Sequence, residues 1–177
     1  MRKVTEPEFA KDFFKKFLIV TLILFFVIST QAQSRSSHSS SYTTALGVKV
    51  WDGAGISLKH FFNGGNNAGE LIGYFYNHGF RLTGLYEIHG DISGASGLKW
   101  YIGPGAHIGF YDAGYTHRGY YYSDSRTHIG IDGVIGLDYK FNGAPSNVSL
   151  DWQPAFEFGD GGGFYGSWGG LGIRYTF

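Results

Sequence analysis

The sequence predicts an all-β fold, an eight-stranded antiparallel up-and-down transmembrane β-barrel that is preceded by a signal peptide. Three observations support this prediction. Apolar and polar residues alternate with the period of a β-strand through most of the chain. The 177 residues include 29 glycines and 19% aromatic residues but only 16% charged residues, whereas glycine averages about 7% in soluble proteins. One long apolar run lies near the N-terminus.

This N-terminal run has the features of a secretory signal peptide. Two lysines precede the apolar segment Phe17–Ile28, and the small residues Thr30 and Ala32 occupy the −3 and −1 positions of a cleavage site after Ala32. The run is shorter than the roughly 20 residues that a transmembrane helix needs. We therefore expect residues 1–32 to be a signal peptide and the mature protein to be exported.

Charge and cysteine content narrow the function classes. The formal net charge of the chain is zero, which does not favour a nucleic-acid partner. Residues 1–32 hold five of the 14 basic and three of the 14 acidic residues, so the mature chain keeps nine and eleven. Cysteine is absent, which excludes disulfides, zinc–cysteine sites and thiol nucleophiles. Residues 33–41 are Ser-rich and predict a flexible linker in which His38 is solvated.

Eight alternating segments follow within residues 42–177, the predicted barrel. The clearest is Gly97–Tyr111, with Trp100 on its apolar face and Lys99 on its polar face. This strand exceeds the usual 5–6 residues of a globular sheet and suits a strand that is tilted across a bilayer. Both faces of Ala68–Tyr76 are apolar, so the facing of that strand stays open. The predicted strands are Tyr42–Trp51, Gly55–Phe62, Ala68–Tyr76, Phe80–His89, Gly97–Tyr111, Thr127–Phe141, Asn147–Phe158 and Phe164–Phe177.

The connections between these segments are mostly short. Turn signals such as Asn63–Asn67 and Asn142–Ser146 join consecutive strands, and residues 112–126 form the longest loop, which is rich in tyrosine. An even number of strands with short connections favours an up-and-down antiparallel barrel. Pro104 and Pro154 fall inside predicted strands, where the missing N–H interrupts the ladder. A β-bulge at each proline would accommodate it; otherwise the predicted strand boundaries are wrong.

The inward faces of the predicted strands carry six positive and six negative charges. Unpaired charges inside a barrel would be costly, and the interior of an eight-stranded barrel is just filled by side chains. We therefore expect a balanced ion-pair network that fills the lumen and leaves no open pore. The predicted lumen charges are Lys49, Lys59, Arg81, Lys99, Lys140 and Arg174, against Glu70, Glu87, Asp132, Asp138, Asp151 and Glu157.

Some of these inward residues could instead perform acid–base chemistry. Glu87 with Asp138 or Asp151 would be the carboxylate pair. A structural polar core accounts for the same residues, and no H-x-H or i,i+4 histidine pattern recurs that would indicate a metal site. Lipid-modifying outer-membrane barrels place Ser and His where lipid reaches them, and we find no such pairing on the outward faces. We therefore predict no catalytic, cofactor-binding or metal-binding residues. The histidines that could take part in such acid–base or metal chemistry are His89, His107 and His128.

The last predicted strand ends on an aromatic residue. Outward alternation ending at Phe177 resembles the C-terminal signal that the outer-membrane barrel assembly machinery recognises. The whole of residues 42–177 resembles the small eight-stranded outer-membrane β-barrel family of OmpX/OmpA transmembrane-domain type, Bacteroidota-like, in the motifs WYIGPGAHIGFY, IDGVIGLDYKF and LGIRYTF. The resemblance implies the outer membrane of a Gram-negative bacterium as the location. It implies membrane lipid and the assembly machinery as partners, and it carries over no catalytic residues.

These expectations lead to one main function and several alternatives. The main one is a non-enzymatic integral outer-membrane protein, porin-like in architecture, with a structural or surface-contact role in the cell envelope. Loop 112–126 would either contact an extracellular partner or anchor the barrel at the membrane interface through its tyrosines. The alternatives are a narrow pore for ions or small solutes, a lipid-A-modifying enzyme, and a soluble secreted barrel whose strands would face the opposite way.

Overall fold

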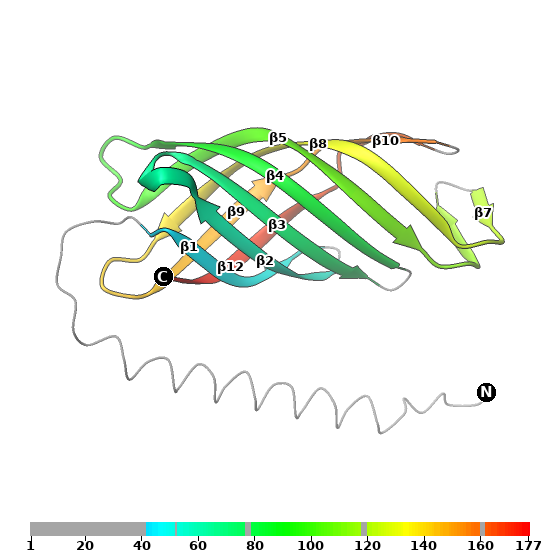
Figure 1. Cartoon of the computed structure of the whole chain (residues 1–177), viewed down its shortest axis with the longest axis horizontal. Coiled ribbons are helices and arrows are strands. Elements are labelled where there is room, and N and C mark those ends of the chain that lie inside the picture. The colour runs from blue at the N-terminus through cyan, green and yellow to red at the C-terminus, as the bar shows by residue number, and fades with distance from the viewer. Residues whose placement is uncertain (1–41, 52, 77–78, 118–119, 160–161) are drawn as a thin grey trace, which may run out of the picture. The chain divides into compact units, whose positions relative to one another are not determined.

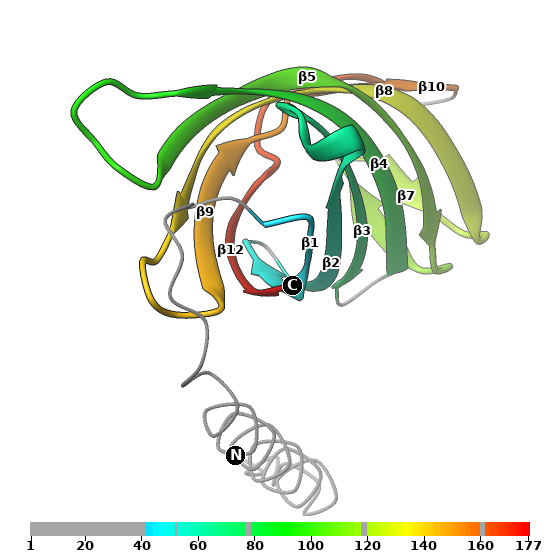
Figure 2. The same cartoon turned by 60° about the vertical axis from the view of Figure 1, so that its left-hand side comes forward.

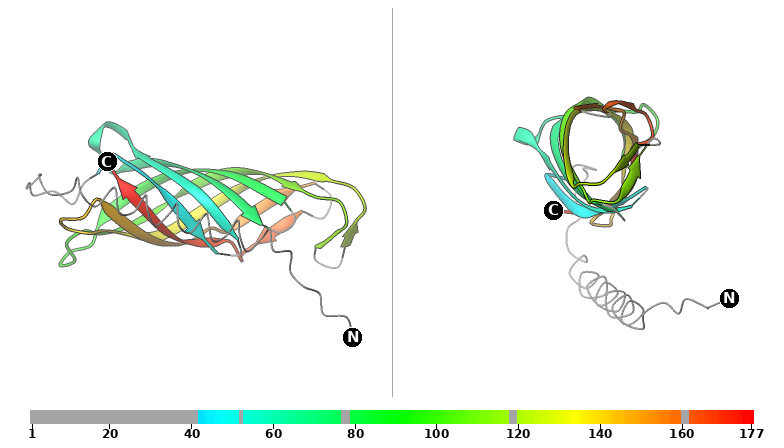
Figure 3. Two further views of the ribbon diagram at one scale, coloured as in Figure 1. Left: turned by 90° about the horizontal axis from the view of Figure 1, so that it is seen from below. Right: turned by 90° about the vertical axis from the view of Figure 1, so that its right-hand side faces the viewer.

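The computed structural model describes residues 42–51, 53–76, 79–117, 120–159 and 162–177. These residues form a closed antiparallel β-barrel of eight strands (Figures 1 and 3). The predicted fold class, an eight-stranded antiparallel barrel, is therefore confirmed. The predicted signal peptide and the predicted linker lie outside the described residues.

Six of the barrel strands are continuous, and the last two are each interrupted once. β9 (Ser146–Trp152) and β10 (Ala155–Phe158) form the seventh strand, and β11 (Gly163–Tyr165) and β12 (Gly169–Thr176) form the eighth. A short 3-10 turn, η1 (Phe62–Gly64), follows β2. The continuous strands are β1 (Thr44–Val50), β2 (Ala54–Phe61), β3 (Asn67–Tyr76), β4 (Gly79–Asp91), β5 (Leu98–Tyr111) and β8 (Arg126–Lys140).

The predicted loop 112–126 contains a hairpin that the alternation pattern does not reveal. β6 (Tyr115–His117) pairs with β7 (Tyr120–Tyr122) in a separate two-stranded sheet beyond the ends of β5 and β8 (Figure 1). Strands of three residues are too short to display a period of two. This part of the prediction is therefore wrong, because the loop is partly regular.

The barrel closes where its first strand meets its last. β1 pairs with β12 from Ala45–Thr176 to Val50–Leu171. The approach is close at Gly47, since a Cβ there would lie 2.0 Å from the carbonyl oxygen of Ile173. We call the end of the barrel that carries Tyr42 and Phe177 the terminal end, and the opposite end, which carries β6 and β7, the hairpin end (Figure 2).

The barrel is apolar outside and charged inside, as the alternation predicts. Ile56 and Ile131 are 57% and 56% exposed, whereas Lys49 and Lys59 are fully buried. This is the reverse of a soluble protein, in which lysine is almost never fully buried. The largest outward side chains of β5, which covers the predicted strand Gly97–Tyr111, are also exposed, namely Trp100, Ile102 and Phe110.

The structure resolves the facing of β3, which the sequence left open. Leu71 and Phe75 are half exposed on the outer face. Ile72 and Tyr74 point inward, where they pack with Leu85, Tyr101 and Val134 in an apolar cluster inside the barrel. Both faces of β3 are apolar because its inner face contributes to this cluster.

No bulge accommodates Pro104, so that prediction is wrong. On β4 and β5, Leu85 pairs with Gly105 and Ile88 pairs with Ile102, with two residues between these pairs on each strand. The register is thus unchanged, and only the pairing at the two positions between them is interrupted. The missing N–H of Pro104 falls in this short gap in the ladder.

Pro154 does coincide with a bulge, but the extra residue lies in the neighbouring strand. β9 and β10 keep one register against β8 on both sides of the proline. In the eighth strand, Tyr165 pairs with Ala155 and Gly169 pairs with Trp152, so three residues oppose two. One extra residue reverses the facing of a strand.

Two tryptophan side chains satisfy backbone carbonyls in this bulge. The indole Nε1 of Trp152 donates to the carbonyl of Gly166 over 2.7 Å, and that of Trp51 donates to Ser167 over 2.6 Å. The next residue, Trp168, lies against inward-facing side chains. The bulge therefore brings an indole into the lumen.

Candidate functional site

The lumen is the part of the barrel in which chemistry-bearing side chains meet. They form two networks. The terminal-side network consists of Lys49, Lys59, Glu70, Glu87, Asp138, Asp151 and Arg174. The hairpin-side network consists of Arg81, His107, Asp132 and Glu157.

The apolar cluster in the lumen separates the two networks. Along the inner face of β4, Leu85 lies between Arg81 and Glu87. Along β8, Val134 lies between Asp132 and Asp138. Each network is therefore a local electrostatic unit.

Arg174 is the central cation of the terminal-side network. Its Nη2 contacts the Oε1 of Glu70, its Nε donates to Ser57 Oγ over 2.7 Å, and its Nη1 donates to Ser149 Oγ over 2.8 Å. The Ser57 hydroxyl in turn donates to Glu70 over 2.6 Å. All three nitrogens of the guanidinium thus have partners, as a buried arginine requires.

The two buried lysines connect the remaining carboxylates of this network. Lys49 Nζ lies 2.6 Å from Asp151 Oδ2 and 3.5 Å from Glu70 Oε1. Lys59 Nζ lies 2.7 Å from Glu87 Oε2, with Glu70 and Asp138 farther away at 3.7 and 3.5 Å. Each lysine therefore has one close carboxylate, and Glu70 lies farther away from both lysines.

The hairpin-side network is built around one arginine. Arg81 Nη2 contacts Asp132, and its Nη1 lies 3.7 Å from Glu157. His107 lies between the same two carboxylates, with Nδ1 2.8 Å from Asp132 and Nε2 3.5 Å from Glu157. This arrangement holds the imidazole in place from two sides.

Aromatic side chains cover both networks. Toward the hairpin end, the Trp168 ring lies 4.3 Å from the guanidinium of Arg81, at cation–π distance. Tyr74 and Tyr76 contact the same indole. Toward the terminal end, Tyr42, Phe61, His89 and Tyr101 stand in successive ring contacts at 4.7–5.0 Å. Aromatic rings therefore lie against the ion pairs toward both ends of the lumen.

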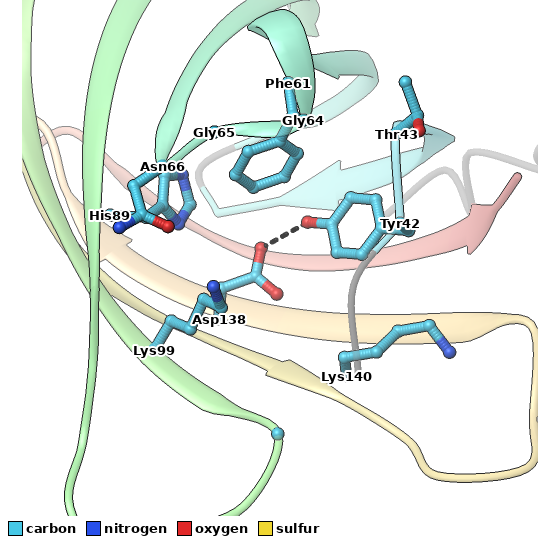
Figure 4. Close-up of a pocket in the computed structure, with 11 residues that line it drawn as sticks. Tyr42, Thr43, Phe61, Gly64, Gly65, Asn66, His89, Lys99, Asp138 and Lys140 are labelled. Atoms are coloured by element: carbon cyan, nitrogen blue, oxygen red, sulfur yellow. Dashed lines mark hydrogen bonds between the residues drawn. The ribbon is translucent and has the colours of Figure 1, made fainter. Parts of the chain in front are cut away.

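A small cavity remains at the terminal end (Figure 4). Its volume is about 140 Å³, and Tyr42, His89 and Asp138 are among the residues that line it. The Tyr42 hydroxyl donates to Asp138 over 2.9 Å. Burial, and next the charge of Asp138, raise the pKa of Tyr42 above its ordinary value, so the phenol remains the donor.

The predicted balance of six charges against six is wrong. All six predicted carboxylates are buried, but of the lysines and arginines that the structure describes only Lys49, Lys59, Arg81 and Arg174 are buried. Lys99 pairs at 3.2 Å with Asp91, which is exposed, and Lys140 donates to the loop carbonyls of Phe141 and Ala144. Both of these lysines lie near the ends of their strands, where a long side chain can reach the barrel rim.

The acid–base candidates of the sequence analysis all lie inside the barrel. Their contacts there are with charged groups of the two networks. Glu87 and Asp138 both contact Lys59, and no contact joins Glu87 to Asp151 in the described residues. His89 contacts Glu87 at 2.9 Å. His128 lies 3.8 Å from Glu157. Within the described ranges no group of three or more His, Asp or Glu side chains could hold a metal ion.

The structure brings together one hydroxyl–imidazole pair on the outer surface that the sequence did not reveal. Thr44 Oγ1 lies 2.9 Å from His60 Nδ1, across the paired strands β1 and β2. The part of the chain that the structure describes places no carboxylate against this imidazole, so the pair lacks the third member of a nucleophile–base–acid arrangement. Thr44 and His60 are directly paired residues, a relation that appears only once the register is known.

The sequence did not identify several other residues of the lumen, because their contacts depend on how far along the barrel axis each residue lies. Ser57, Ser149 and Asn147 supply neutral hydrogen bonds to the charged groups. The inward position of Tyr101 follows from the alternation, but its 2.5 Å hydrogen bond to Asp151 does not.

Comparison with known proteins assigns no family to the chain. No family model, no curated protein and no solved structure matches it. Among the described residues, no helix has the length and apolar character to cross a membrane.

Proposed function

We propose that this protein is a non-enzymatic integral outer-membrane β-barrel protein of a Gram-negative bacterium, with a structural or surface-contact role and a lumen that does not conduct. The observation that carries the proposal is the apolar outer surface of a closed barrel whose interior is charged. A soluble barrel would have the opposite arrangement.

The apolar surface extends around the whole barrel. Contiguous apolar patches larger than a few hundred Å² are rare on soluble monomers, whereas a transmembrane barrel presents an apolar band to lipid. Strands that span a bilayer have about 9–11 residues; β3, β4, β5 and β8 have 10, 13, 14 and 15 residues, whereas β1 and β2 have 7 and 8. The large outward side chains include Leu46, Val48, Ile56, Leu71, Phe75, Ile88, Trp100, Ile102, Ile129, Ile131, Ile135, Leu150, Phe156, Leu171 and Ile173.

The absence of conduction is proposed from the filling of the lumen. Eight strands leave an interior just wide enough for side chains. Two ion-pair networks, an apolar cluster and aromatic residues near both ends occupy that interior. A hydrated ion would have to displace several of these contacts at once.

A surface-contact role is favoured by the shape of the hairpin end. The long strands β5 and β8 continue into the β6–β7 hairpin, which carries four tyrosines in the eight residues 115–122 (Figure 1). The other connections at this end are short. A projecting tyrosine-rich hairpin suits contact with an extracellular partner.

Membrane location is tested by fractionating cells that express the full chain. We expect the protein in the outer-membrane fraction, resistant to a urea wash and soluble only in detergent. The folded barrel should also migrate faster than the boiled protein on a denaturing gel. Recovery of the protein from the soluble periplasm would overturn the proposal.

Conduction is tested with the purified barrel in planar lipid bilayers. We expect no steady single-channel openings. Removal of Arg81 and Trp168 together should produce brief openings, since their cation–π contact covers the hairpin-side network. Steady openings of the unaltered protein would overturn the filled-lumen proposal and favour the narrow-pore alternative.

A further inference from the structure

The charges of the terminal-side network do not balance. Three buried cations, Lys49, Lys59 and Arg174, face four buried carboxyl groups, Glu70, Glu87, Asp138 and Asp151. A net charge buried away from water is very costly, and a carboxyl group relieves that cost by taking up a proton. We infer that the network binds one proton, which Glu87 holds and shares with Glu70, and that His89 exchanges this proton with the terminal-end cavity.

The contacts of the four carboxyl groups indicate which one is protonated. Glu70 has the most cationic partners, Arg174 with both lysines. Asp151 has the closest contact of Lys49 and accepts hydrogen bonds from Tyr101 and Gln153. These two groups are therefore stabilised as anions.

Asp138 and Glu87 compete for the one remaining cation, Lys59. Asp138 also accepts hydrogen bonds from the Tyr42 hydroxyl and from Asn147 Nδ2, each at 2.9 Å. Such donors favour the ionised form of a carboxyl group. Glu87 has the closest contact of Lys59, at 2.7 Å, but apart from it only His89. It is the least supported anion of the four and is the group expected to hold the proton.

The geometry offers this proton a place between two carboxyl groups. Glu70 Oε2 and Glu87 Oε1 are both buried acceptors for which the described residues provide no donor. The two carboxyl groups lie on the inner face of the neighbouring strands β3 and β4, and both lie against Lys59 Nζ, Glu70 Oε2 at 3.7 Å and Glu87 Oε2 at 2.7 Å. A proton on Glu87 would satisfy both oxygens with one hydrogen bond.

His89 connects this pair of glutamates to the terminal-end cavity. Its Nε2 lies 2.9 Å from Glu87 Oε2, and the residue lines the cavity (Figure 4). The residue is 2% exposed, and no partner for its Nδ1 exists among the residues that the structure describes. A neutral imidazole donates at one nitrogen and accepts at the other. It can therefore pass a proton between the cavity and Glu87.

The cavity opens at the rim of the barrel. Gly64 and Gly65, which line it, are exposed residues of the β2–β3 connection. Among the described residues, the titratable and charged groups around Glu87 are Lys59 from β2, Glu70 from β3, His89 from its own strand, Tyr101 from β5 and Tyr42. Asp138 from β8 shares Lys59, Arg174 from β12 contacts Glu70, and Lys99 and Lys140 line the cavity.

This site makes barrel stability depend on pH in a defined direction. A glutamate in an unfolded chain is ionised above about pH 4.3, whereas Glu87 in the barrel keeps its proton. The folded state then binds one more proton than the unfolded state, so stability falls as pH rises. Each pH unit raises the unfolding constant about tenfold for as long as Glu87 remains protonated in the barrel.

The test compares Glu87→Gln with Glu70→Gln by urea unfolding of the full chain in detergent micelles at pH 6, 7, 8 and 9. Glutamine mimics a protonated glutamate. We expect E87Q to be more stable than the unaltered protein already at pH 6, with an unfolding constant about fiftyfold smaller, because pH 6 lies about 1.7 units above the glutamate pKa of the unfolded chain. The difference should grow tenfold with each further pH unit, because E87Q lacks the proton that Glu87 takes up on folding. E70Q should be less stable than E87Q at every pH, since it removes the carboxylate that all three cations contact.

Two results would overturn the inference. One is an unchanged pH dependence in E87Q. The other is a loss of stability in E87Q at pH 6 as large as that in E70Q, which would mean that Glu87 is an anion and that His89 carries the charge. If a variant does not fold, infrared spectroscopy of the unaltered barrel decides, because a protonated carboxyl group has its own carbonyl band. Absence of this band at pH 7 would also refute the proposal.

Discussion

The substitution Arg174→Met tests whether the ion pairs of the lumen hold the barrel together. Arg174 is 1% exposed and contacts Glu70, Ser57 and Ser149. Removing one partner of a buried ion pair costs about 3–5 kcal/mol, because the other charge stays buried. Lys49 remains 3.5 Å from Glu70 and limits the damage. We therefore expect a loss of about 3–4 kcal/mol in the free energy of unfolding, a large part of the ~5–15 kcal/mol that stabilises a typical protein.

The assay is equilibrium unfolding by urea of the barrel in lipid vesicles, followed by tryptophan fluorescence and by migration on an unheated denaturing gel. A double variant, R174M with E70Q, is the matched comparison. We expect it to recover at least about 2 kcal/mol relative to the sum of the two single losses, because neither charge is left unpaired. The neighbouring lipid-facing change Ile173→Met should cost less than about 1.5 kcal/mol. A loss below about 1 kcal/mol in R174M, or strict additivity in the double variant, would refute the reasoning.

Three further predictions concern other parts of the barrel. Ile131→Arg places a charge on the outer face, where Ile131 is 56% exposed, and should cost about 2–4 kcal/mol in the same vesicle assay; an unaffected barrel would argue against lipid at this face. Gly47→Val should lower the yield of folded barrel on unheated gels, because its Cβ would meet the Ile173 carbonyl at 2.0 Å, and normal folding would show that β1 and β12 can separate there. Trp168→Leu should cost about 1–2 kcal/mol of stability by removing the contact with Arg81, and it should leave the membrane location unchanged.

Most of the fold follows from the sequence because facing in a strand depends only on the parity of the residue number. The faces of Gly97–Tyr111 were predicted correctly for this reason. The facing of β3 could not be predicted, because Ile72 and Tyr74 are apolar residues that point into an otherwise charged lumen. Their place inside becomes evident only when Leu85 and Val134 are known to pack against them.

The charges show a second limit of the alternation pattern. The pattern states which face a lysine occupies but not how deep it lies along the barrel axis. Lys99 and Lys140 belong to the inward set by parity, yet they lie near strand ends and find partners at the rim. The terminal-side network is therefore short of a cation, and the shared proton inferred for Glu87 follows from this depth effect.

The position of Trp168 depends on two strands at once. Phe164 and Leu171 both face outward, although they are seven positions apart and an unbroken strand would place them on opposite faces, so the eighth strand must slip by one residue between them. Gly166 and Ser167 have no strong preference for either face, so the sequence of this strand alone does not locate the slip. Pro154 on the neighbouring strand does, because its missing N–H makes this the place where a regular ladder is already broken. A strand whose outward residues change from even to odd positions opposite a proline in the adjacent strand is therefore expected to contain a bulge there. In this barrel the bulge places the indole of Trp168 over the buried guanidinium of Arg81.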